Sequence, residues 1–164
     1  MQRSFSRQGR SGFDDFKERI VGGKKAVEPI PWQAHITLMK GSDTFQCGGT
    51  ILDEETILSA AHCFDSKKLG SIKVETGMIA NPYLERTFVI NETTSNVREV
   101  LIHPNFTRIH KGDDIAILKV KKPLTFNKDV QPACLPEPSF SPEDGERGIV
   151  SGWGRTSPKG KTLV

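Results

Sequence analysis

Apolar and polar residues alternate along the stretch that begins at residue 32. One set takes every second position, namely Trp32, Ala34, Ile36 and Leu38. The residues between them are Gln33, His35 and Thr37. Because successive side chains of a strand point to opposite faces, a period of two is typical of a strand with one buried face. The pattern therefore predicts a half-buried strand over residues 32–38.

Shorter apolar runs predict further strands at residues 45–52, 56–61, 72–76, 87–90, 97–102 and 115–120. Turn-forming residues gather between them at residues 41–43, 77–82, 91–96 and 104–112. Within the first run, Gly48 and Gly49 predict a bulge or a close approach of two backbones. Many short strands separated by such turns are typical of an all-β barrel or sandwich.

Two segments lack this pattern. Residues 1–19 are rich in Arg, Ser, Gly and acidic residues and predict a flexible leader. Residues 121–148 hold five prolines and predict a long connector. The run from Ile149 to Trp153 then predicts the start of a new strand. At 164 residues the chain has the size of one ordinary domain, or of a larger one cut short.

Composition excludes several classes of protein. Apolar residues make up 35% and charged residues 26%, which favours a packed core over disorder. The net charge of +3 is spread among acidic residues without the basic stripe that nucleic-acid binding requires. No apolar run approaches the roughly 20 residues that span a membrane. Residues 1–7 lack the apolar stretch of a secretory signal, which by itself favours a cytoplasmic protein.

A set of short motifs follows one order along the chain. They are Arg19 before Ile20-Val21-Gly22-Gly23, then Pro31-Trp32-Gln33, Cys47-Gly48-Gly49-Thr50, Ser59-Ala60-Ala61-His62-Cys63, Asp114-Ile115-Ala116-Ile117-Leu118, Gln131-Pro132-Ala133-Cys134-Leu135-Pro136 and Ser151-Gly152-Trp153-Gly154. Each motif alone is weak evidence for a family. Their occurrence together in one order is very unlikely to arise by chance. On these motifs the chain resembles the chymotrypsin/trypsin family of secreted serine endopeptidases over residues 19–164.

The resemblance implies a fold of two antiparallel β-barrels with the active site between them. It assigns the first Greek-key barrel to about residues 20–135. It assigns the connector and the start of the second barrel to residues 136–164, and a propeptide-like leader to residues 1–19. The matched part corresponds to the first half to two-thirds of the family's catalytic domain.

The resemblance also assigns two catalytic residues. Histidine ionises near neutral pH, so it can take a serine proton and return it to the leaving amine. An isolated histidine is more often a plain surface or core residue, but the setting beside Cys63 favours His62 as the general base. Asp114 would accept a hydrogen bond from its Nδ1–H and hold the tautomer. The adjacent Asp113 is the alternative candidate for this role. In the family the aspartate directly precedes Ile-Ala, so the resemblance selects Asp114.

The family's nucleophile lies in Gly-Asp-Ser-Gly-Gly-Pro, and these residues contain no such run. Ser59 and Ser151 fall in segments that are structural in the family. The resemblance therefore implies a serine endopeptidase in the full-length parent and no peptidase activity for this chain alone. The alternative is a non-catalytic, protease-like binding module or decoy.

The cysteines imply a secreted protein. In the family Cys47 and Cys63 would form a disulfide, while Cys134 would bond to a propeptide, an upstream chain or a distant cysteine. Residues 1–19 contain no cysteine, so Cys134 is unpaired within this chain. A zinc site of Cys47, His62 and Cys63 is the competing interpretation. It is disfavoured because structural zinc takes four ligands, typically from Cys-x-x-Cys pairs, and none occurs.

Other expectations follow from the same resemblance. Cleavage between Arg19 and Ile20 would activate the zymogen, and the sequons at Asn91 and Asn105 are candidate glycosylation sites. Residues 74–85 hold only two acidic residues, so we expect neither calcium nor any other metal or cofactor. Expected partners are protein or peptide substrates, an activating protease, protease inhibitors and an upstream chain linked through Cys134.

Overall fold

The computed structural model describes residues 26, 28–65, 70–78, 89–155 and 162–163. Eight strands and two single 3₁₀ turns make up its regular structure. The strands are β1 (Gln33–Lys40), β2 (Asp43–Ile51), β3 (Thr56–Ser59), β4 (Ile72–Met78), β5 (Val89–Ile102), β6 (Ala116–Val120), β7 (Gly154–Arg155) and β8 (Thr162–Leu163). The 3₁₀ turns are η1 (Ala61–Cys63) and η2 (Ile109–Lys111).

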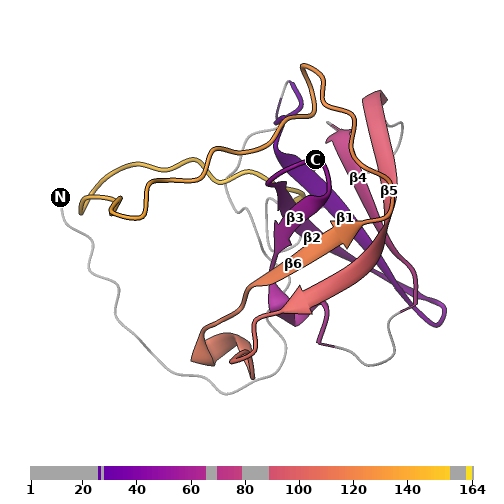
Figure 1. Cartoon of the computed structure of the whole chain (residues 1–164), viewed down its shortest axis with the longest axis horizontal. Helices are drawn as coiled ribbons and strands as arrows, with labels where there is room; N and C mark the ends of the chain where they lie inside the picture. Colours follow the sequence, from indigo (N-terminus) through magenta and orange to yellow (C-terminus); the bar gives the residue numbers. More distant parts are fainter. Residues whose placement is uncertain (1–25, 27, 66–69, 79–88, 156–161, 164) are drawn as a thin grey trace.

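The first six strands form one closed antiparallel barrel (Figure 1). Their order around the barrel is β1-β2-β3-β6-β5-β4, and β4 pairs with β1 to close it. Three neighbouring strands are followed by a fourth that returns beside the first, which is a Greek key. The predicted all-β fold and the Greek-key barrel are confirmed.

Strand β5 is longer than the sequence predicts. Residues 91–96 were expected to be a turn between two strands, and this expectation is wrong. Residues 93–96 pair with β4, whereas residues 100–102 pair with β6, and the register shifts between Val97 and Glu99. β5 is therefore one continuous strand with a bulge, which pairs first with β4 and then with β6. Both neighbours supply backbone hydrogen-bond partners to its polar residues.

The core lies inside the barrel and contains three of the four apolar residues predicted for one face of β1, namely Ala34, Ile36 and Leu38, whereas Trp32 precedes the strand and is 46% exposed. Its fully buried members include Ala34, Ile36, Leu38, Ile51, Ile57, Val74, Leu118, Val120 and Val130. The prediction that β1 is only half buried is wrong, because His35 and Thr37 on its other face are buried as well. The Glu75 carboxylate of β4 lies beside both residues, and the Trp153 ring packs on His35.

Gly49 marks a close approach of two strands inside the barrel. A Cβ atom there would lie 2.7 Å from Cγ2 of Ile57 and 3.0 Å from Cδ1 of Ile36. Pairing with β1 continues without a register shift through Gly48 and Gly49. Of the two alternatives that the sequence left open, the structure has the close approach and no bulge.

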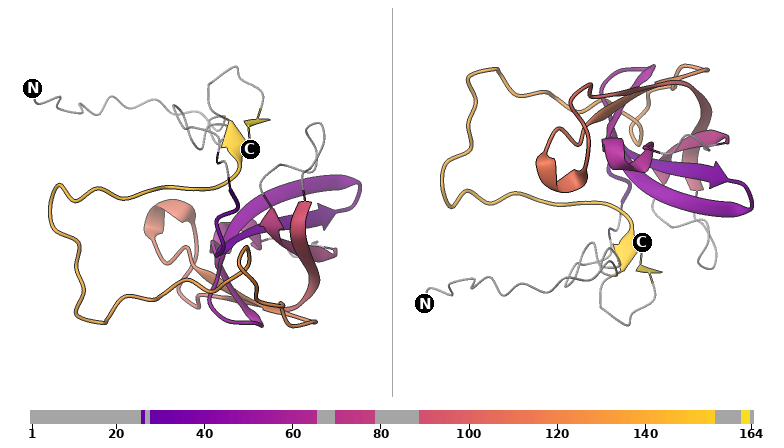
Figure 2. Two further views of the ribbon diagram at one scale, coloured as in Figure 1. Left: turned by 90° about the horizontal axis from the view of Figure 1, so that it is seen from above. Right: turned by 90° about the horizontal axis from the view of Figure 1, so that it is seen from below.

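The chain beyond β6 first packs against the core of the barrel and then leaves it. Leu124 and Val130 are buried in the core, whereas residues 135–150 are exposed. Figure 2 shows this segment running away from the barrel and returning to β7. The strand predicted from Ile149 starts only at Gly154, because residues 149–153 lack a strand partner among the described residues.

Several predicted features lie outside the described residues. They include the leader over residues 1–19, the Arg19–Ile20 bond and residues 87–88 of one predicted strand. In the described part of the chain, no helix is long and apolar enough to cross a membrane.

Candidate active site

His62 lies on a short turn that the core holds in place. Strand β3 ends at Ser59, and Ala61 at the start of η1 is fully buried. The N–H of Phe64 donates to the carbonyl of Ala61 at 2.9 Å, and the Phe64 ring is buried. The buried residues on both sides fix the turn, while the side chain of His62 stays about one-third exposed.

Asp114 reaches the same place from the loop before β6. Ser59 and Ala116 are paired across β3 and β6, so the residue after β3 and the residue before β6 lie at the same end of the barrel. The loop turns sharply at Gly112 and Asp113, whose φ angles are 87° and 55°. This left-handed conformation favours glycine and tolerates aspartate. It brings Asp114 over η1.

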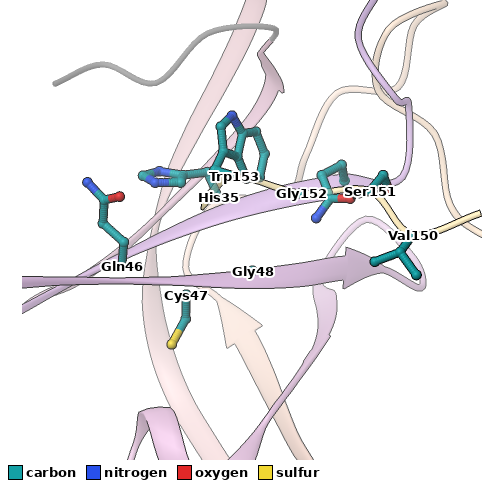
Figure 3. Close-up of a pocket in the computed structure, with 9 residues that line it drawn as sticks. His35, Gln46, Cys47, Gly48, Val150, Ser151, Gly152 and Trp153 are labelled. Carbon is teal, nitrogen blue, oxygen red and sulfur yellow. Dashed lines mark hydrogen bonds between the residues drawn. The ribbon is translucent and has the colours of Figure 1, made fainter. Parts of the chain in front are cut away.

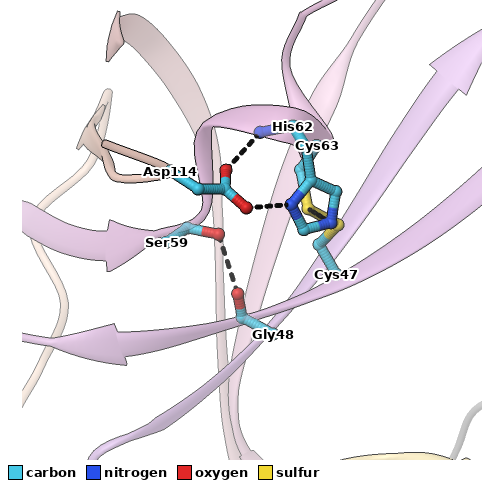
Figure 4. A network of polar contacts seen from close by, with 6 residues as sticks. All are labelled: Cys47, Gly48, Ser59, His62, Cys63 and Asp114. Carbon is cyan, nitrogen blue, oxygen red and sulfur yellow. Dashed lines mark hydrogen bonds and ion pairs between the residues drawn. A yellow bond between two sulfur atoms is a disulfide. The ribbon is translucent and has the colours of Figure 1, made fainter. Parts of the chain in front are cut away.

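The carboxylate of Asp114 holds His62 at two points (Figure 4). Its Oδ2 atom lies 2.7 Å from Nδ1 of the imidazole ring. Its Oδ1 atom accepts a hydrogen bond of 2.8 Å from the backbone N–H of the same residue. An ionised carboxylate only accepts, so Nδ1 carries the proton and Nε2 presents its lone pair. Among the predicted candidates, the structure brings His62 and Asp114 together. Asp113 instead lies 3.7 Å from His103.

The pair also sets the ionisation of the carboxyl group. Partial burial raises the pKa of Asp114, but hydrogen bonds from the backbone N–H and the ring of His62 outweigh it. The pKa of Asp114 therefore lies below its usual value of 3.8. The group is a carboxylate at neutral pH, as an acceptor for an imidazole requires.

Two serines belong to the sequence motifs, and both hydroxyl groups donate hydrogen bonds to other parts of the chain. Ser59 donates to the carbonyl of Gly48 at 2.8 Å, and Ser151 donates to Oε1 of Gln33 at 2.8 Å. Within the described residues, no serine hydroxyl is hydrogen-bonded to His62. Among the described residues, the geometry therefore brings a histidine and a carboxylate together with no serine hydroxyl bonded to the ring.

A disulfide between Cys47 and Cys63 joins β2 to η1. It closes a loop of 16 residues and contributes roughly 3 kcal/mol to stability. The Cys63 sulfur lies 3.7 Å from Nε2 of His62. Cys134 is an exposed free thiol. Asn105 is exposed, whereas the side chain of Asn91, within β5, lies outside the described residues.

Comparison with known proteins places this site in a family. The family model described as Trypsin matches residues 20–164. The chain belongs to the trypsin family. The predicted relationship to chymotrypsin-like and trypsin-like serine proteases is confirmed.

Members of the trypsin family from different animals share this region. The chain is 41% identical over 143 residues to ovochymase of Halocynthia roretzi, with 84% of this chain and 9% of that protein covered. It is 34% identical over 147 residues to vitamin K-dependent protein C of Rattus norvegicus, with 87% and 30% covered. It is 37% identical over 141 residues to transmembrane protease serine 9 of the same species, with 85% and 13% covered.

A solved structure shows the same architecture. The structure of GrC superposes with a TM-score of 0.74 at 26% identity, covering 87% of this chain and 60% of that one. The trypsin-family chain thus spans less than one third of the curated relatives that it matches and 60% of the solved one.

Sequence reasoning missed a second His–carboxylate pair in this trypsin-family barrel. His35 and Glu75 are directly opposed on β1 and β4, with Nδ1 3.4 Å from Oε2. Lys73 contacts the other oxygen at 2.6 Å. A pocket of about 200 Å³ is lined by His35, Ser151 and Trp153, among other residues (Figure 3). The predicted period of two indicated the faces of each strand, but not which strands pair.

The His35–Glu75 pair should make the free energy of unfolding of the barrel depend on pH. The hydrogen bond with His35 lowers the pKa of Glu75 most, burial opposes it, and Lys73 adds to it. The pKa is about 2 instead of 4.5. Such a carboxylate contributes roughly 3 kcal/mol above pH 4.5, and this contribution is lost as the pH falls toward 2.

Urea denaturation at a series of pH values measures this effect. Glu75→Gln should reduce the loss of stability between pH 4.5 and 2. Glu99→Gln, at an exposed position of β5, should leave it unchanged. An unaltered pH profile in the Glu75 variant would contradict the assignment.

Proposed function

We propose that the chain carries part of the active site of a serine endopeptidase, in which His62 is the general base and Asp114 orients it. The observation that supports this most is the double contact of one carboxylate, 2.7 Å to the ring Nδ1 and 2.8 Å to the backbone N–H. This contact fixes both the tautomer and the direction of the ring. Membership of the trypsin family supports the same assignment.

The reaction follows from the orientation of the ring. Nε2 takes the proton of a serine hydroxyl while its oxygen attacks the carbonyl carbon of a peptide bond. Nε2 then gives that proton to the departing amine, and an acyl-enzyme remains until water releases it. Asp114 stays ionised and stabilises the imidazolium. The proposal takes the serine and the oxyanion hole from residues outside this sequence, since Ser59 and Ser151 are engaged in other hydrogen bonds.

The other predicted properties belong to the same proposal. Cleavage between Arg19 and Ile20 activates the enzyme, and the complete protein is secreted and acts on proteins or peptides. The exposed thiol of Cys134 forms a disulfide with another segment or chain. Asn105 is exposed and is the better supported glycosylation site of the two.

A fluorophosphonate probe, which labels activated serines, tests the proposal. Residues 1–164 alone should remain unlabelled, because in the described part of the chain no serine hydroxyl is hydrogen-bonded to His62. The complete protein should be labelled at one serine, and His62→Ala should abolish the labelling. Stoichiometric labelling of the 164-residue chain would reveal a nucleophile that the proposal omits. An unlabelled complete protein would favour the non-catalytic binding module.

A further inference from the structure

A second histidine, His103 after the end of β5, contacts both neighbours of Asp114 in the chain. The N–H of His103 donates to the carbonyl of Ile115 at 3.0 Å. Its ring nitrogen Nδ1 lies 3.7 Å from Oδ1 of Asp113. The N–H of Ile115 also donates to the carbonyl of Asp113 at 2.8 Å. The residue that contacts His62 is therefore flanked on both sides by residues that His103 touches.

The contacts of the His103 ring show which nitrogen carries its proton. The backbone N–H of Asn105 donates to Nδ1 at 3.3 Å. Nδ1 therefore presents a lone pair, and in this neutral ring the proton lies on Nε2. The distance of 3.7 Å from Nδ1 to the Asp113 carboxylate is too long for a hydrogen bond, and neither atom has a proton to donate. In this form the ring binds Asn105 and makes no hydrogen bond with Asp113.

We propose that His103 is a positioning residue for Asp114, and that its ring exchanges Asn105 for Asp113 as its partner when it takes up a proton. The solvent supplies this proton, which binds to Nδ1, and Nε2 keeps its own. The N–H of Asn105 then loses its acceptor, and Nδ1–H donates to the carboxylate of Asp113. The hydrogen bond is assisted by charge, since a cation now faces an anion.

The new partner lies at the strained point of the loop. Asp113 has a φ angle of 55°, a left-handed conformation that is unfavourable for residues other than glycine. This turn brings Asp114 over η1, where its Oδ1 atom accepts the N–H of His62 at 2.8 Å. An ion pair on the Asp113 side chain would favour this turn over other conformations of the loop. It would therefore hold Asp114 more firmly against His62.

The charges around His103 favour Asp113 as its partner. Among the described residues, Asp113 is the one acid within ion-pair distance of the His103 ring. Asp114 is engaged by His62 instead. The segment at η2 contributes three exposed basic residues, none of which forms an ion pair with a described residue, namely Arg108, His110 and Lys111. Because these three are exposed, solvent and salt weaken their repulsion of a proton on His103.

This exchange makes the position of Asp114 depend on pH. Histidine ionises near neutral pH, so the pair with Asp113 forms as the pH falls and is lost as the pH rises. The two side chains are 36% and 47% exposed, so the effect is modest. The role of His103 in catalysis rests on the proposed function, whereas the exchange of partners does not. The test therefore measures the contact between Asp114 and His62 and not peptidase activity.

Hydrogen exchange of the His62 backbone amide, followed by NMR in the 164-residue chain, reports this contact because the N–H donates to Asp114. Protonation of His62 itself also changes the exchange, so the parent is compared with His103→Gln, in which His62 is intact. Glutamine offers Asn105 an acceptor but takes up no proton. We expect the parent to be protected about 2- to 5-fold more than His103→Gln at about pH 5.5, and equally at about pH 8.

Two further variants complete the test. Asp113→Asn removes the charge that His103 pairs with, so it should show the same loss of protection at acid pH as His103→Gln. His110→Gln, at an exposed histidine on η2 in the same loop, should keep the profile of the parent. Equal protection in the parent and His103→Gln at every pH would overturn the proposal. So would a parent-like profile in Asp113→Asn, which decides the question even if His103→Gln does not fold.

Discussion

Under the proposed function, we expect His62→Ala to lower kcat of the complete protein by about 10⁶-fold, the magnitude known for the histidine of Ser-His-Asp peptidases. In the proposed mechanism, the change removes the group that takes the serine proton. The loss should appear in kcat, while KM changes little, because the ring serves the transition state more than substrate binding. Steady-state hydrolysis of a peptide ester, after activation, measures both constants.

The stability of the variant separates catalysis from folding. The His62 ring is partly exposed, so its removal should leave the thermal midpoint nearly unchanged. His110→Ala, at an exposed histidine outside the site, should keep full activity. A His62 variant that retains more than a hundredth of the parent kcat would contradict the role of general base.

Asp114→Asn should lower kcat by about 10⁴-fold, again the magnitude known for this class of enzyme. An amide group presents donors as well as an acceptor, so the ring is no longer held with its proton on Nδ1. A neutral ring that carries its proton on Nε2 has no lone pair on that atom, so Nε2 cannot accept the serine proton. The side chain keeps its shape, so folding should be preserved.

The neighbouring acid provides a control for this substitution. Asp113→Asn changes the same charge one residue away, on an exposed side chain that faces His103. It should retain most of the activity. The 164-residue chain alone gives a second readout, because NMR of the His62 ring reports which nitrogen is protonated. An unchanged tautomer in Asp114→Asn would contradict the orienting role.

The sequence predicted the residues of this pair, but not the contact that joins them. His62 and Asp114 were identified by the motifs around them, which are local. Their meeting depends on β3 and β6, whose pairing of Ser59 with Ala116 is a property of the whole barrel. The hydrogen bond to the backbone N–H of His62 depends in addition on the left-handed turn at Asp113, which no motif indicated.

The errors have a common physical cause. Residues 91–96 are polar and turn-like, yet β4 and β6 offer them and their neighbours backbone partners, so one strand forms. His35 is polar, yet Glu75 satisfies one ring nitrogen and Trp153 covers the ring. In both cases, a partner distant in sequence overrides the local preference. A period of two assigns a residue to a face but does not show what covers that face.

The order of the strands along the chain has a consequence for biosynthesis. The barrel strands end at Val120, and the described core extends only to Val130. A chain that emerges from the ribosome N-terminus first can therefore close this barrel, and join His62 to Asp114, before later residues are available. We expect this part to fold early and independently of whatever supplies the serine. A defect in the later region would then leave a folded protein whose base has nothing to deprotonate.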